Sequence, residues 1–234
     1  MPQINYSASW VDVVNNGLGL LGLPFIQALT DSSDAALAAN NHLDDTISDV
    51  VQSFDWQCLK TQAQIQLCAN TPPYKWMYAY QLPSDFGRII DVDVGGADYE
   101  IGYGDSVGVN ALVIFTNGHG DSFNAQGVQT SANQIANITY IRMPQDPNSL
   151  PMYLKSLIAT QLAGEIAPRL LDNEQAISRI LKQGQEQWEH ALSADSRLRQ
   201  DSKPMDGSAG KVWNDEHRRG VPALVSPWSR YQGF

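Results

Sequence analysis

Pairs of carboxylates are the residues of this chain whose spacing comes closest to a catalytic arrangement. Asp91 and Asp93 alternate along a predicted strand, which puts both side chains on one face. Glycoside hydrolysis uses two such carboxylates, so the pair raises the possibility of polysaccharide hydrolysis or sugar binding. Asp44 and Asp45 fall on the solvated side of a predicted helix. Because acidic residues are common on solvated surfaces, the interpretation of Asp91 and Asp93 as a solvated strand face is favoured.

No other catalytic or metal-binding pattern is present in the sequence. Its four histidines have neither i, i+4 nor metal-ligand spacing: His42, His119, His190 and His217. Cys58 and Cys68 are too few and too widely spaced for a zinc knuckle or a redox pair. There is no phosphate-binding loop, no GxSxG and no Cys–His signature. We therefore expect no catalytic residue, no metal site and no cofactor.

The charge of the chain limits its partners. It has 234 residues, with 25 Asp and Glu against 15 Lys and Arg, for a net charge of -10. An acidic surface repels duplex DNA rather than binding it. The most apolar segment, residues 17–29, contains Pro24 and is too short to cross a bilayer, and no signal peptide is visible. We expect no membrane association.

Four segments have apolar residues at three- and four-residue steps, the period of an amphipathic helix. They are residues 11–21, from the loop at 31–33 to about 54, from about 151 to 168, and from 172 to about 192. The first ends near Gly22, and the second follows a cluster of capping residues. Pro168 interrupts the third. The fourth begins at Asp172, with Gln175 three residues later as in a capping box.

Between the second and third helices the apolar period changes to two, the period of a half-buried strand. Residues 78–94 alternate on both sides of Pro83, Ser84 and Asp85, which predicts two strands joined by an ordered turn. Further predicted strands are residues 59–69, 99–101, 112–115 and 138–141. Residues 117–134 are rich in Gly, Asn, Gln and Ser and indicate a long loop.

These elements predict an α+β fold that is mainly α. We expect a four-helix bundle with an antiparallel β domain inserted between its second and third helices. The bundle domain would comprise residues 1–56 and 148–200, and the inserted domain residues 57–147. Residues 201–234 show no period and would form an extended C-terminal arm.

The C-terminal arm has the composition of an interface anchor. Residues 203–234 hold five Lys and Arg residues and three Asp and Glu residues, so this part of the chain is mildly basic. Large aromatic side chains and arginines, which dominate protein–protein hot spots, are Trp213, Arg218, Arg219, Trp228, Arg230, Tyr231 and Phe234. A plain disordered tail would be depleted of such residues. The alternative is that the arm folds back on its own bundle.

Several strings of residues, in this order, carry a family resemblance. They are Asn15 with Leu18-Gly19, the stretch Leu21-Gly22-Leu23-Pro24, residues 35–43 leading to Trp56, and Met143-Pro144 ahead of the helix with Leu162-Ala163 and Ile166-Ala167. The most specific string lies between them and comprises Tyr80, Leu82, Pro83, Asp85 and Arg88. Over about residues 9–194 the chain resembles the tail tubular protein A family, the head-to-tail adaptors, or connectors, of short-tailed bacteriophages.

The resemblance implies a structural virion protein and not an enzyme. Members of that family form dodecameric rings in the viral tail, between the portal protein of the capsid and the tail nozzle protein. Double-stranded DNA passes through the ring during ejection without sequence-specific binding. The protein would be located in the virion neck, after assembly in the cytoplasm of the host bacterium. The C-terminal arm would then be the candidate segment for portal binding. The smaller connector ring of long-tailed phages and a carbohydrate-active enzyme or sugar-binding module remain the alternatives.

Overall fold

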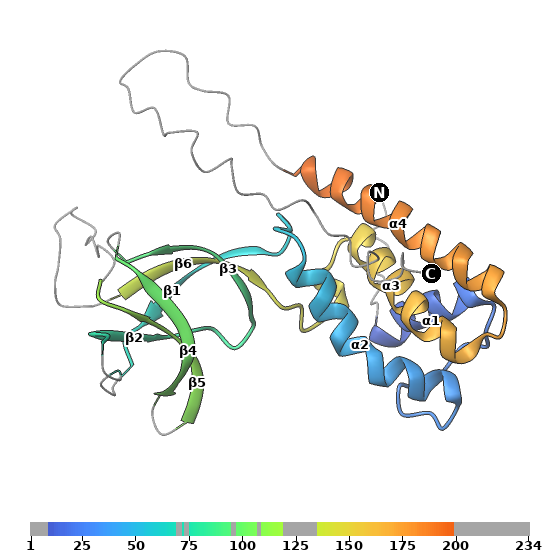
Figure 1. Ribbon diagram of the computed structural model, residues 1–234, viewed down its shortest axis with the longest axis horizontal. Coiled ribbons are helices and arrows are strands. Elements are labelled where there is room, and N and C mark those ends of the chain that lie inside the picture. The colour runs from blue at the N-terminus through green and yellow to red at the C-terminus, as the bar shows by residue number, and fades with distance from the viewer. Residues whose placement is uncertain are drawn as a thin grey trace, which may run out of the picture. The chain divides into compact units, whose positions relative to one another are not determined.

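The computed structural model describes residues 9–68, 72, 75–94, 97–106, 109–118 and 135–198 (Figure 1). These residues form four α-helices, two small antiparallel β-sheets and a short 3-10 helix, so the predicted α+β class is confirmed. Two helices precede the six strands in the chain and two follow them. The described residues divide into a helical unit, residues 9–53 and 146–198, and a β unit within Phe54–Gln145.

The bounds of the helices follow local signals. They are α1, Trp10–Leu21; α2, Asp34–Gln52; η1, Pro147–Ser149; α3, Met152–Leu170; and α4, Glu174–Ser196. Helix α1 begins with a capping box, in which the Ser9 hydroxyl accepts from the Asp12 amide and the Asp12 carboxylate accepts from the Ser9 amide at 2.7 Å. It ends at Gly22, whose φ of 72° is left-handed, as predicted.

Two predictions about helix ends were wrong. Helix α4 is capped by Asn173 and not by Asp172, because the Asn173 side chain reaches the amides of Gln175 and Ala176 at 3.0 and 3.3 Å. Pro168 does not interrupt α3, which continues to Leu170. Pro168 has no amide to donate to the carbonyl of Gly164, but only two helical residues follow it, so little of the helix depends on the missing bond.

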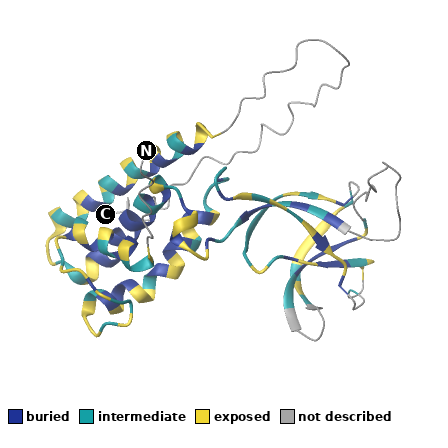
Figure 2. Ribbon diagram, turned by 180° about the vertical axis from the view of Figure 1, so that it is seen from behind, coloured by how far each residue is buried: buried dark blue, intermediate teal, exposed yellow. Residues whose placement is uncertain are grey.

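Helix α3 organises the helical unit. It contacts α1, α2 and α4, and it is buried on most of its surface. In Figure 2 the buried residues of the four helices gather toward the middle of this unit. Gly17 of α1 lies against α3 so closely that a Cβ at this position would come within 2.7 Å of the backbone oxygen of Ala159. Contact at this distance requires a glycine.

The β unit consists of two three-stranded sheets, with strand orders β1-β6-β3 and β2-β5-β4. The strands are β1, Lys60–Gln66; β2, Tyr78–Gln81; β3, Phe86–Asp93; β4, Tyr99–Ser106; β5, Val109–Thr116; and β6, Ile135–Arg142. Strands β2 and β3 are consecutive in the chain but belong to different sheets. The sheets meet where Leu67 bridges to Tyr80 and the Cys68 amide donates to the Ala79 oxygen at 2.7 Å.

Both sheets contribute to one apolar core. The β1-β6-β3 sheet supplies Ile65, Ala136, Ile138 and Tyr140, and the β2-β5-β4 sheet supplies Tyr80 and Ile114. Cys68, Ala79, Val113 and Phe115 form a second cluster on the other face of the β2-β5-β4 sheet. The predicted loop lies mostly outside the described residues, and the C-terminal arm lies wholly outside them.

Candidate functional site

The most specific string of the family resemblance forms the β2–β3 corner, defined here as Tyr80–Arg88. The Leu82 amide donates to the backbone oxygen of Leu112 at 3.0 Å, which attaches the start of the corner to β5. The Met143 amide donates to the backbone oxygen of Asp85 at 2.7 Å, just after the end of β6. Since β5 and β6 belong to different sheets, the corner joins the two sheets of the β unit.

The side chain of Asp85 strengthens the second of these attachments. Its carboxylate accepts a hydrogen bond from the Tyr140 hydroxyl at 2.9 Å. The ring of Phe86 stacks on Tyr140, with ring centroids 6.0 Å apart. Burial, together with the Asp85 carboxylate, raises the pKa of Tyr140 to about 12. Tyr140 therefore stays protonated at physiological pH and acts as a donor that orients Asp85.

Tyr80 and Arg88 stand at the two ends of the corner. Tyr80 is fully buried, its hydroxyl has no hydrogen-bond partner among the described residues, and burial raises its pKa to about 12. Arg88 forms a half-exposed ion pair with Asp55, near the start of the β unit. The corner thus makes structural contacts within the β unit, because Asp85 and Arg88 each bind a residue of that unit outside the corner.

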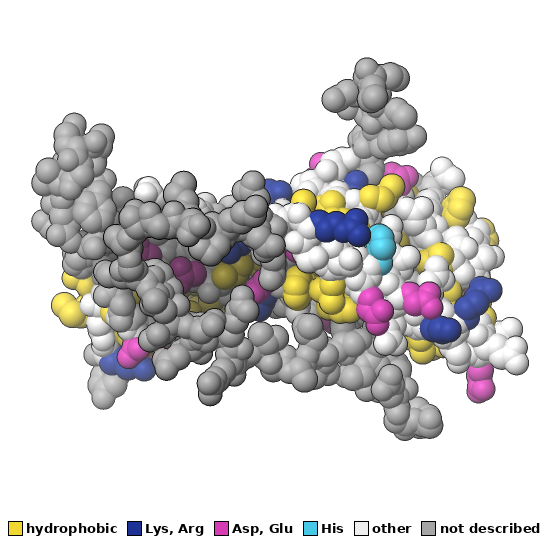
Figure 3. All heavy atoms as spheres, turned by 90° about the horizontal axis from the view of Figure 1, so that it is seen from above, with side chains coloured by type: hydrophobic (Ala, Val, Ile, Leu, Met, Phe, Trp, Pro, Cys, Tyr) yellow, Lys and Arg dark blue, Asp and Glu magenta, His cyan; other side chains and the backbone are white. Residues whose placement is uncertain are grey.

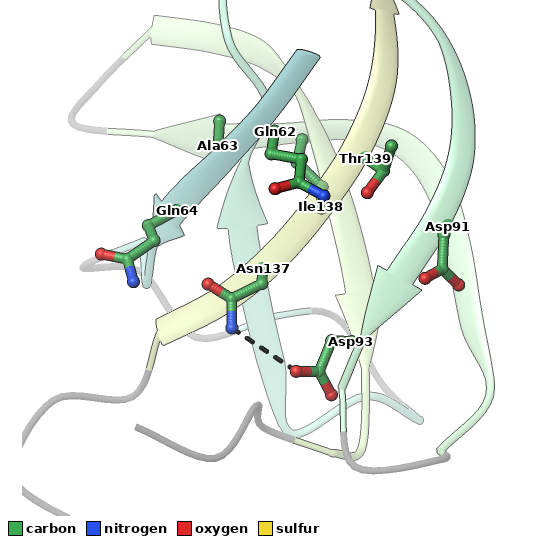
Figure 4. Close-up of a pocket in the computed structure, with 8 residues that line it drawn as sticks. All are labelled: Gln62, Ala63, Gln64, Asp91, Asp93, Asn137, Ile138 and Thr139. Atoms are coloured by element: carbon green, nitrogen blue, oxygen red, sulfur yellow. Dashed lines mark hydrogen bonds between the residues drawn. The ribbon is translucent and has the colours of Figure 1, made fainter. Parts of the chain in front are cut away.

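A shallow polar groove lies on the outer face of the β1-β6-β3 sheet (Figure 4). It has a volume of about 390 Å³. Its lining residues are Gln62, Ala63, Gln64, Asp91, Asp93, Asn137, Ile138 and Thr139. The strand register arranges the polar ones in two rows, each crossing all three strands. One row is Gln62, Thr139 and Asp91; the other is Gln64, Asn137 and Asp93.

The groove combines hydrogen-bond donors with carboxylate acceptors. Asn137 donates to an Asp93 carboxylate oxygen at 3.4 Å, and Figure 4 shows this contact across the end of the groove. Amides, a hydroxyl and carboxylates in two rows can hydrogen-bond a polyhydroxylated ligand. The sequence pointed to Asp91 and Asp93 on one face, and both line the groove.

Sequence reasoning missed the amide and hydroxyl partners of those aspartates. Gln62 and Gln64 alternate along β1, and Asn137 and Thr139 alternate along β6, so each pair was visible as a polar strand face. Their position next to Asp91 and Asp93 depends on β6 lying between β1 and β3. That strand order has no signal in the alternation of any single strand.

The helical unit contains two polar contacts that tie α3 to its neighbours. The Thr46 hydroxyl of α2 lies 2.9 Å from a carboxylate oxygen of Glu165, and the Nδ1 atom of His42 lies 3.7 Å from the same oxygen. Burial raises the pKa of Glu165, and the contacts with Thr46 and His42 oppose this effect. On the other side of α3, the Tyr153 hydroxyl donates to the buried Asp195 of α4 at 2.7 Å.

Charges on the surface do not gather into one patch on the face shown in Figure 3. Acidic and basic side chains are interspersed there, over the part of the chain that is described. Asp44 and Asp45 are exposed on α2, as the sequence predicted. Within the described residues, no three His, Cys, Asp or Glu side chains come together as they would around a metal ion. None of the described helices has both the length and the apolar composition that a bilayer crossing requires.

Comparison with known proteins adds no support to the family resemblance, which depends on the residues quoted above. No protein-family model matches this chain, and no curated protein sequence matches it. The predicted portal-binding residues all lie outside the described part of the chain: Trp213, Arg218, Arg219, Trp228, Arg230, Tyr231 and Phe234.

Proposed function

We propose that this chain is a structural virion protein, a head-to-tail adaptor whose ring joins the portal to the tail nozzle and forms part of the DNA ejection channel. The observation that carries the proposal is the discontinuous helical unit. Its first two helices and its last two are separated in the chain by the whole β unit. This is the element order that the resemblance implies, a four-helix bundle with an inserted antiparallel β domain.

The packing of the helices supports the bundle. Helix α3 contacts each of the other three, and α1 also contacts α2 and α4. Polar contacts on two sides of α3, Thr46–Glu165 and Tyr153–Asp195, restrict how its neighbours can slide. A scaffold that must hold its shape under the forces of DNA packaging and ejection benefits from such restraint.

The β2–β3 corner supports a structural role for the β unit. The most specific string of the resemblance is used to join two sheets, which is a structural role. A net charge of -10 also suits a conduit, because an acidic wall repels the phosphates of passing DNA and lets it slide.

Electron microscopy of the purified protein, alone and mixed with portal protein, tests the proposal. We expect rings, in the number that the resemblance implies (twelve), or a ring stacked on the portal. Monomers that neither form rings nor bind the portal would contradict it. A portal that remains bare after mixing would likewise contradict the adaptor role.

The C-terminal arm is the proposed contact with the portal. Deletion of residues 203–234 should leave a folded helical unit and β unit, because the helices and sheets described above lie within residues 9–198. Stable attachment to the portal should be lost. A truncated protein that decorates portals as the full chain does would show that the arm is not the anchor.

A second candidate function, sugar binding by a virion-associated module or enzyme, is favoured by the polar groove alone. Asp91→Asn or Asp93→Asn should then abolish binding or cleavage of bacterial polysaccharide, because either change removes a carboxylate from the groove. Asp44→Asn, an exposed change on α2, is the matched control. Equal binding by all three variants would exclude the groove as a sugar site.

A further inference from the structure

Among the described residues the two sheets present four edges, and strand β4 has the least protected of them. Strand β3 carries Asp91 and Asp93 and has two irregularities in its register. Strand β1 carries Lys60 and a row of glutamines, and β2 has only four residues, one of which bridges to Leu67. Charges, bulges and short length are the usual protections of a sheet edge. Strand β4 carries Glu100, which is paired with Lys75, but it has eight residues and pairs with β5 along all of them, without a register shift.

The two faces of β4 differ sharply. On one face, Gly102 and Gly104 leave room for the side chains of β5: a Cβ at Gly104 would come within 2.8 Å of a Val113 methyl group, and one at Gly102 within 3.1 Å of the Phe115 ring. The side chains of β5 therefore lie over the two glycines. On the other face stand three large side chains at alternate positions, Tyr99, Ile101 and Tyr103.

These three side chains are exposed although they lie on the same face as the core. Ile101 is paired with Ile114, which is fully buried in the core, and Tyr103 with Leu112, which packs against it. Yet the exposed fractions are 41% for Tyr99, 37% for Ile101 and 73% for Tyr103. The outer edge of β4 pairs with no other strand that the structure describes. An apolar row that is continuous with a core, on such a strand, is a surface that another strand would cover.

We propose that this surface binds a second copy of the chain, through antiparallel pairing of β4 with β4 centred on Ile101. The sequence of the strand is symmetric about that residue, with tyrosine two positions before and two positions after it. Pairing about Ile101 puts Tyr99 opposite Tyr103 of the second copy, twice, and Ile101 opposite its own counterpart. Aromatic and β-branched cross-strand pairs are the favourable ones.

The charges of β4 fit the same register. Glu100 would face Gly102 of the second copy, and Asp98 would face Gly104, so no acidic residue stands directly opposite another. The two Glu100 residues would be diagonal neighbours. Each is already paired with Lys75, whose Nζ lies 3.1 Å from its carboxylate, and this exposed ion pair reduces the repulsion. A general apolar partner would have no reason to match these positions, whereas a second copy does.

The pairing is independent of the adaptor proposal. A two-fold contact uses the same surface on both copies, whereas a cyclic ring is built from two different surfaces on each subunit. The β4 pairing therefore describes the protein outside the ring. It joins two β2-β5-β4 sheets into one sheet of six strands. Three side chains and one strand per copy make a contact smaller than the roughly 1,200–2,000 Å² of a standard interface, so the dimer should be weak and concentration-dependent.

Single-cysteine substitutions test the register directly. Directly opposite residues have Cα atoms about 4.5–5.5 Å apart, which is within the range that a disulfide spans. Tyr99 and the second copy's Tyr99 would be about 13 Å apart along the strand. Under mild oxidation, Ile101→Cys should form a covalent dimer with itself. Tyr99→Cys and Tyr103→Cys should each stay monomeric alone and cross-link when mixed. The unmodified chain, with Cys58 and Cys68, is the background control.

Sedimentation of the full chain between about 1 µM and about 1 mM tests the association without any cross-link. The chain should shift from monomer to dimer, and Tyr103→Lys should move the midpoint at least tenfold higher. Met152→Lys is the matched control, because Met152 is equally exposed, at 74%, but belongs to the helical unit. Circular dichroism checks that both variants are folded.

Three results would overturn the pairing. They are a monomer at every concentration, the same midpoint for Tyr103→Lys and the unmodified chain, or cross-links that ignore the register, such as Tyr99→Cys with itself. Rings on the portal combined with any of these would support the adaptor proposal and reject the β4 dimer. An in-register dimer that never binds the portal would do the reverse.

Discussion

Replacing Gly17 with alanine tests how closely α1 must approach α3. A Cβ at this position would lie 2.7 Å from the backbone oxygen of Ala159 and 3.8 Å from the Ala163 methyl group. The first distance is well inside ordinary contact, and a backbone atom in the centre of α3 cannot rotate away. Helix α1 would have to shift outward, which weakens the packing of its buried residues, among them Val14 and Leu18.

The size of the effect follows from a matched substitution in the same helix. Gly19→Ala places a methyl group 3.4 Å from the Phe25 ring, which is ordinary contact. Both substitutions gain the helix propensity of alanine over glycine, about 1 kcal/mol. Only Gly17→Ala adds the cost of overpacking, about 1–3 kcal/mol. The free energy of unfolding should therefore be about 1–3 kcal/mol lower for Gly17→Ala than for Gly19→Ala.

Urea denaturation of both variants and of the unmodified chain, followed by the circular dichroism of the helices, measures this difference. Gly19→Ala should be at least as stable as the unmodified chain, and Gly17→Ala less stable than Gly19→Ala. Equal stability of the two variants would refute the close packing of α1 on α3. A stabilising Gly17→Ala would show that the helices can separate at no cost.

Two further predictions concern ionisable groups. Burial raises the pKa of Glu165, so there is an interval above the ordinary range of a carboxyl in which the folded state holds a proton that the unfolded state has lost. The free energy of unfolding should fall as pH rises through that interval. Glu165→Gln should flatten this pH dependence and raise the melting temperature at neutral pH. A variant that keeps the original pH profile would contradict the role of burial. Tyr140→Phe removes the hydrogen bond to Asp85 and should lower the free energy of unfolding by about 1 kcal/mol, because water can solvate the half-buried Asp85 carboxylate. Asp85→Asn, combined with Tyr140→Phe in a double-mutant cycle, should show coupling between the two residues, and additive effects would argue against the contact.

Local signals in the sequence were sufficient for most of the elements. The capping residues around Ser33 and the left-handed Gly22 mark helix ends because they act within one turn of backbone. Alternation predicted the strands on both sides of Pro83 for the same reason, because successive side chains of a strand point to opposite faces. Where two capping residues stood side by side, at Asp172 and Asn173, the pattern could not choose between them.

The candidate sites depended more on tertiary structure. Asp91 and Asp93 were visible as a pair, but the groove needs β1 and β3 on either side of β6, an order that joins strands distant in the chain. The sequence predicted a short strand at residues 99–101, but not the exposure of Tyr99, Ile101 and Tyr103. Their exposure arises because β4 is the last strand of its sheet.

By itself the sequence therefore determined the elements, their order and the apolar face of each, because these depend on side chains within a few residues of one another. Only the tertiary structure decided that β2 and β3 enter different sheets, that Gly17 lies against Ala159, and which strands are edges. Those features depend on the relative free energies of alternative long-range pairings. Periodicity is identical in all of these pairings, and only packing distinguishes them.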